Sequence, residues 1–120
     1  MPFFILKTNQ TIDDETATEI KTAFGKAIEL VPGKSEQYLL LEIQDRCKIY
    51  LRGSDREPIA YITASIFGNE SHLGYAELTD AITRILQTIL HIPSHNIYIK
   101  FDDIAVWSVA GKTIDRNQLR

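Results

Sequence analysis

The stretch IAYITASIF at residues 59–67 is rich in β-branched and aromatic residues, which favour a long β-strand. After a polar loop at 68–71, apolar residues recur every three or four positions, as in an amphipathic helix, until Ile92-Pro93 ends the pattern. The next stretch, IYIKF at 97–101, alternates like a second strand. This order predicts a βαβ unit, in which two parallel strands are joined by a helix that covers one face.

The first half of the chain has the same pattern. PFFILK at 2–7 and YLLLEI at 38–43 read as strands, and an apolar helical stripe between them stops at Pro32-Gly33. Thr11 and Asp14 have the spacing of a capping box, so we expect Thr11 to start this helix. Two such units predict an α+β fold, in which a four-stranded mixed sheet carries both helices on one face. The other face is too apolar to be wetted, so we expect other subunits to cover it.

Shorter features complete the expected fold. Residues 48–51 are expected to pair with the preceding strand as a hairpin across Asp45-Arg46, and Asp102-Asp103 is expected to be a turn before a last short strand at 105–110. The whole is one domain over residues 1–114, with pseudo-repeats at about 1–55 and 56–114. Residues 115–120 are expected to be a loose polar tail.

Composition excludes several classes of protein. The 120 residues carry a net charge of −3 and are 44% hydrophobic, which fits one ordinary globular domain. Apolar runs are too short to span a membrane, the first residues do not resemble a secretory signal, and mild acidity argues against nucleic-acid binding. The single Cys47 cannot form an internal disulfide, so we expect a cytoplasmic location. With one cysteine and dispersed histidines, we expect no metal site.

Several short motifs occur in a specific order: Met1-Pro2 opening directly into a strand, Thr8-Asn9, Gly33-Lys34, Gln37-Tyr38, Gly53-Ser54, Ser65-Ile66, and Ile97-Tyr98-Ile99 before an acidic pair. With these motifs, residues 2–114 resemble the macrophage migration inhibitory factor family of the tautomerase superfamily. The resemblance implies two βαβ units per subunit, a homotrimer, and a cofactor-independent tautomerase.

The resemblance assigns the central role to Pro2. If an aminopeptidase removes Met1, the Pro2 nitrogen becomes a secondary amine. An ordinary α-amino group has a pKa of about 7.7–8.0, and burial near cations lowers it, so the amine can serve as a general base near neutral pH. If Met1 stays on, the nitrogen is an amide and cannot be a base. The alternative interpretation is that the second residue is proline by chance or because of its place at a strand edge.

Four further residues are substrate-binding candidates by resemblance. Lys34 is expected to bind a substrate carboxylate, or else to complement the dipole at the end of the helix. Ile66 is expected to contribute its backbone N–H while its side chain packs in the core. Tyr98 is expected at a subunit boundary, or as a half-buried strand aromatic. Lys100 stands where the macrophage factor has an amide residue, and it either adds a second cation to the site or faces solvent.

The resulting hypothesis is a tautomerase or isomerase of small 2-oxo (enol) carboxylic acids, with the Pro2 amine as base. The alternative is a binding or cytokine-like protein of the same fold with little turnover. Two departures bear on this choice. The family's Cys-x-x-Cys is replaced by Ile59-Ala60-Tyr61-Ile62, which leaves no support for thiol redox chemistry. Trp107 comes a few residues too early to match the family's pocket aromatic. Release from cells without a signal peptide, as in relatives, stays open.

Overall fold

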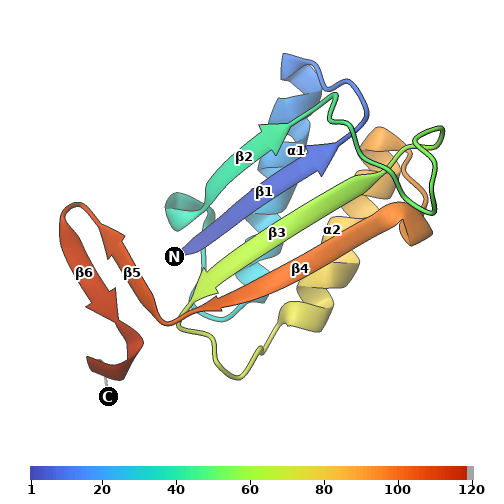
Figure 1. Ribbon diagram of the computed structural model, residues 1–120. Coiled ribbons are helices and arrows are strands. Elements are labelled where there is room, and N and C mark those ends of the chain that lie inside the picture. Colours follow the sequence, from blue (N-terminus) through green and yellow to red (C-terminus); the bar gives the residue numbers. More distant parts are fainter. Residues whose placement is uncertain (119–120) are drawn as a thin grey trace.

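The protein contains both expected βαβ units, as seen in the computed structural model, which describes residues 1–118 (Figure 1). Three short 3-10 turns at 28–30, 36–38 and 94–96 connect the main elements. The elements in chain order are β1 (Pro2–Thr8), α1 (Asp14–Ala27), β2 (Leu40–Gln44), β3 (Ala60–Phe67), α2 (Tyr75–Leu90), β4 (Ile97–Ile104), β5 (Val106–Val109) and β6 (Lys112–Asp115).

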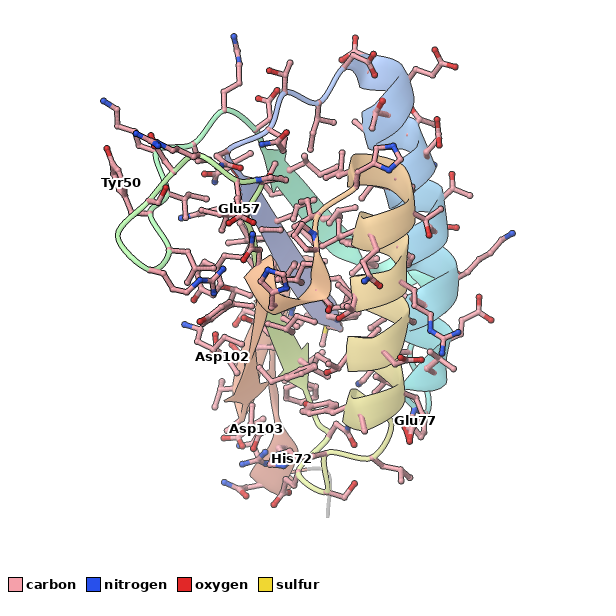
Figure 2. The ribbon with its side chains drawn as sticks, turned by 90° about the vertical axis from the view of Figure 1, so that its right-hand side faces the viewer. Tyr50, Glu57, His72, Glu77, Asp102 and Asp103 are labelled. Atoms are coloured by element: carbon pink, nitrogen blue, oxygen red, sulfur yellow. The ribbon has the colours of Figure 1, made fainter. Side chains whose placement is uncertain are left out.

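The main sheet has the strand order β2-β1-β3-β4. Strands β1 and β2 are parallel, as are β3 and β4, while β1 and β3 are antiparallel and join the two units. Both helices lie on one side of this sheet, and the loop bearing Tyr50 and Glu57 lies at the opposite end from Asp103 (Figure 2). The expected α+β class and mixed sheet are therefore confirmed. The additional strands β5 and β6 form a separate hairpin.

Alternation along the strands sets the two faces of the sheet. Phe4 and Leu6 of β1 are fully buried against the helices, and Phe4 meets Phe24 of α1 edge to face with ring centroids 6.0 Å apart. Burial of large apolar side chains at about 25 cal/mol per Å² is the main stabilisation. The open face mixes apolar and polar side chains, including exposed Tyr98 and Lys100. Its coverage by other subunits stays a prediction.

The first helix is capped differently from the expectation. Asp13, rather than Thr11, is the N-cap, and its Oδ1 accepts the Thr16 N–H at 2.8 Å. This hydrogen bond stabilises the carboxylate and lowers the pKa of Asp13. The capping-box prediction was wrong because two cap-forming side chains lie two residues apart, and the helix begins at Asp14.

The expected hairpin at 48–51 is also wrong. The chain instead crosses toward β3, and the N–H groups of Arg46 and Cys47 donate to the carbonyls of Gln10 and Thr8, each at 2.9 Å. Only an isolated bridge joins Leu51 and Ser54 in this part of the described chain. These N–H groups thus form hydrogen bonds with the residues at the end of β1 and are not available to pair with β2.

The end of the chain is more regular than expected. Asp102-Asp103 is not a turn, because β4 continues through both residues to Ile104. The expected loose tail begins with the last residue of β6, followed by a 3-10 turn at Arg116–Gln118. Leu119 and Arg120, the rest of that tail, lie outside the described residues. No helix within residues 1–118 is long and apolar enough to cross a membrane.

Gly74 gives a test of this packing. It caps α2 with φ +88°, and a Cβ there would lie 2.4 Å from the carbonyl oxygen of Leu30. Gly111 has φ +77° but open space around it. Both alanine variants carry left-handed strain of about 1–2 kcal/mol. We predict that Gly74→Ala loses at least ~1 kcal/mol more than Gly111→Ala in urea unfolding at equal protein concentration, because of the clash with backbone. Equal losses would contradict this packing.

Candidate functional site

An open cavity of about 710 Å³ lies where the N-terminus, the start of β2 and the β5–β6 hairpin meet. The side chains around it are mostly apolar, which favours a ligand with an apolar body. The lining residues are Met1, Pro2, Gln37, Tyr38, Leu39, Leu40, Trp107, Ser108, Val109 and Ile114.

The pairing of β1 with β3 holds the N-terminus at this cavity. Pro2 lies opposite Ile66, and the Phe67 N–H donates to the Met1 carbonyl at 3.3 Å. On the other side, Trp107 of β5 lies opposite Ile114 of β6. The cavity is therefore bounded by the sheet on one side and by a hairpin far along the chain on the other.

Lys34 lies near the Met1 amine but is not among the residues that line the cavity. Its N–H donates to the Val31 carbonyl at 3.1 Å, and Pro32 and Gly33, with φ +77°, occupy the positions that a type II turn favours for them. The Lys34 Nζ donates to the Phe67 carbonyl at 2.6 Å. The turn after α1 thus delivers an ammonium group to the end of β3 where Met1 is bound.

The terminal amine is strongly affected by these surroundings. Partial burial, and then the positive charge of Lys34, lower the pKa of the Met1 amine from 8.0 to about 6. At pH 7 most of this amine is neutral and able to accept a proton. The ammonium form is disfavoured because it loses water and meets a second cation.

The other expected site residues lie apart from Pro2 in one subunit. Ile66 is fully buried in the core and is not among the residues that line the cavity, so its role stays a prediction. Tyr98 pairs with Tyr61 and Lys100 with Thr63, five and three residues from Ile66 along β3. At roughly 3.3 Å per residue, these distances are about 16 and 10 Å. One subunit therefore brings Pro2 and Lys34 together but not Tyr98 and Lys100.

Lys100 and Tyr98 project from the open face of the sheet. The Lys100 Nζ lies 3.9 Å from Asp102 Oδ1, and its side chain is 55% exposed. Tyr98 is 54% exposed. Among residues 1–118, no group of three His, Cys, Asp or Glu side chains is arranged to hold a metal ion.

Sequence reasoning missed much of the cavity wall. Trp107 lines the cavity although its position in the sequence did not match, and Tyr38 and Ile114 were not identified as wall residues. Phe67 was also missed, although its carbonyl binds Lys34 and its N–H binds Met1. Its position directly after Ser65-Ile66 was the available signal.

The parts assembled here suit proton transfer on an anionic molecule. A neutral amine can accept a proton, a nearby lysine attracts a carboxylate, and apolar walls reduce the competing effect of water.

Comparisons with known proteins give the family. A profile of the family described as macrophage migration inhibitory factor (MIF) matches residues 1–114. The crystal structure of Leishmania major MIF2 is similar with a TM-score of 0.87 and 22% identity, over 95% of this chain and 97% of that chain. The MIF homologue from Prochlorococcus marinus has a TM-score of 0.80 and 21% identity, over 92% and 97%.

A more distant structure shares the fold. The crystal structure of Pt0534 inactivated by 2-oxo-3-pentynoate has a TM-score of 0.82 and 12% identity, over 98% of both chains. A search of curated protein sequences found no match. Because the family profile covers nearly the whole sequence, the chain belongs to the macrophage migration inhibitory factor family.

Proposed function

We propose that this protein is a cofactor-independent keto–enol tautomerase of small 2-oxo carboxylic acids, acting in the cytoplasm. The observation that carries the proposal is the amine at the chain start, which lies at an apolar cavity near Lys34 and has a pKa lowered to about 6. Membership of a family with a tautomerase fold supports a reaction of this class. Removal of Met1 transfers the role of terminal amine to Pro2.

The proposed reaction needs only proton movements. The Pro2 amine takes the proton from the carbon next to the keto group, the electrons of that C–H bond form the enolate, and the proton then goes to the enolate oxygen. The reverse sequence converts enol to ketone. Lys34 holds the substrate carboxylate and stabilises the negative charge that develops on the enolate. The Ile66 backbone N–H orients the substrate.

The site is completed by a neighbouring subunit in this proposal. Tyr98 and Lys100 are offset from Pro2 along the strands by about 16 and 10 Å, at ~3.3 Å per residue. Neither residue reaches Pro2 within its own subunit. In a homotrimer, the neighbour's open sheet face supplies both residues, Tyr98 to orient the substrate and Lys100 as a second cation. The monomer is then inactive.

The substrate class has chemical support. The crystal structure of Pt0534, which has the same fold, is of the protein inactivated by 2-oxo-3-pentynoate. That compound is a 2-oxo acid, as are the substrates proposed here. The apolar wall of the cavity favours 2-oxo acids with an apolar side chain over smaller polar ones.

The role of Pro2 is tested by comparing three forms of the protein: with Met1 removed, with Met1 retained, and with Pro2→Ala. We expect the processed wild type to convert the enol of a 2-oxo acid to the ketone about 10²–10⁴ times faster than the Met1-retaining form, because general base catalysis contributes this much. Pro2→Ala should also be slower. Ultraviolet absorbance of the enol gives the rate, and intact mass verifies processing. Equal rates in the three forms would exclude the mechanism.

The pH profile tests the electrostatics. For the processed protein, kcat/KM should rise with pH through a pKa well below the ordinary value of about 7.7–8.0, because only the free amine is a base. Lys34→Met should raise this pKa only partly, since burial is a larger cause than Lys34 of the lowered pKa of the neighbouring Met1 amine. Lys7→Met, at the other end of β1, removes an equal charge and should leave the pKa unchanged. An unshifted profile for Lys34→Met would contradict the role of its charge.

The apolar wall is tested at Trp107. Trp107→Ala should raise KM about tenfold for a 2-oxo acid with a bulky apolar side chain, and much less for pyruvate, because burial of apolar surface is lost. Val106→Ala changes the neighbouring residue, which is 51% exposed and does not line the cavity, and should leave both KM values unchanged. The same KM change for both substrates would argue against an apolar wall.

A further inference from the structure

We propose that Arg116 is a positioning residue, which anchors the β5–β6 hairpin so that Trp107 and Ile114 stand as a wall of the cavity. The proposal rests on the proposed function only in taking the cavity as the substrate site. Arg116 lies beyond residues 1–114, which the family profile matches, so the family match does not assign it a role.

The hairpin has little other support within the described chain. Its two strands pair with each other and not with the main sheet. It leans away from the body at the end of the sheet where β1 begins (Figure 1). Val106 and Val109 remain about half exposed. A two-stranded hairpin without further packing is marginally stable in water, so within its own subunit its orientation depends on the contacts at its base.

Arg116 makes those contacts. Its backbone N–H donates to the Ala105 carbonyl at 2.9 Å, which closes the base of the hairpin just outside β5 and β6. Its Nη1 donates to both carboxylate oxygens of Asp103, at 2.9 and 2.8 Å. Its Nε lies 3.1 Å from Glu70 Oε1. One side chain thus connects the hairpin to the end of β4 and to the loop before α2.

The geometry makes this anchor stronger than an ordinary surface ion pair. The Arg116 side chain is only 21% exposed, and the guanidinium contacts two carboxylates from different elements. Charge-assisted bonds to a carboxylate are about twice as strong as neutral hydrogen bonds. They raise the pKa of Arg116, so the charge persists at all physiological pH values.

The contacts of Arg116 lie at the same end of the sheet as Pro2. Asp103 pairs with Ile66, and Ile66 pairs with Pro2, so the three strands are in register here. A shift at the base of the hairpin therefore moves Trp107 relative to Pro2. Asp103 and the loop residue His72 are both visible at this end (Figure 2).

The single tryptophan of the chain makes the test direct, because fluorescence excited at wavelengths that tyrosine does not absorb reports on Trp107 alone. Four proteins are compared: wild type, Arg116→Met, Arg116→Lys, and the control Arg84→Met. Arg84 forms an exposed ion pair with Asp80 on α2, with an N–O distance of 3.1 Å. The measurements are acrylamide quenching of Trp107, and kcat and KM of the processed proteins for an apolar 2-oxo acid.

We expect Arg116→Met to increase quenching about twofold and to raise KM about tenfold with a much smaller change in kcat, because a displaced wall weakens substrate binding before chemistry. Arg116→Lys keeps the charge but has one nitrogen, which cannot hold both Asp103 and Glu70 as Nη1 and Nε do, so it should recover only part of both effects. Arg84→Met should match wild type.

The outcomes separate this inference from the proposed function. Unchanged quenching and KM in Arg116→Met would overturn the anchor. A loss confined to kcat would also overturn it, because a wall residue acts on binding. If quenching rises in Arg116→Met while the processed wild type shows no turnover, the anchor stands and the proposed function fails.

Discussion

The antiparallel pairing of β1 with β3 is the constraint on which the rest of the structure depends. It joins two βαβ units, which would otherwise be separate two-stranded sheets, and it runs from Pro2 opposite Ile66 to Thr8 opposite Ala60. At its far end the buried Thr8 Oγ1 donates to the Ile59 carbonyl at 2.7 Å. A slip of one residue would turn the buried face of β1 outward, so the core fixes the register and with it the position of the chain start.

The electrostatics of the candidate site follow from that position. The first residues are held at the sheet end, where burial and Lys34 both disfavour the ammonium form of the terminal amine. The family resemblance proposed Pro2 and Lys34 as candidates because their motifs are local, and the structure brings the two residues together. The sequence did not identify the wall around Trp107, since the placement of the hairpin depends on contacts of Arg116 with Asp103 and Glu70, which lie 13 and 46 residues away.

The fold was predictable where the apolar period was strong. Both helices follow from apolar repeats of about 3.6 residues, and the four strands follow from short apolar, β-branched or alternating stretches between turn residues. Prediction failed where a local signal competed with distant partners. Residues 48–51 alternate like a strand, yet the backbone just before them is hydrogen-bonded to residues at the end of β1. Asp102-Asp103 has the composition of a turn, yet pairing with β3 keeps it extended.

The central claim is that the freed amine of Pro2 moves a proton at the carbon next to the keto group. Exchange in D₂O measures this step without any need for product formation. With processed protein and a 2-oxo acid bearing two protons at that carbon, NMR should show one of the two replaced by deuterium faster than the other, because the base lies on one side of the cavity. The Met1-retaining form should show only the slow, unselective background. Equal exchange of both protons, or equal rates with and without Met1, would contradict the account.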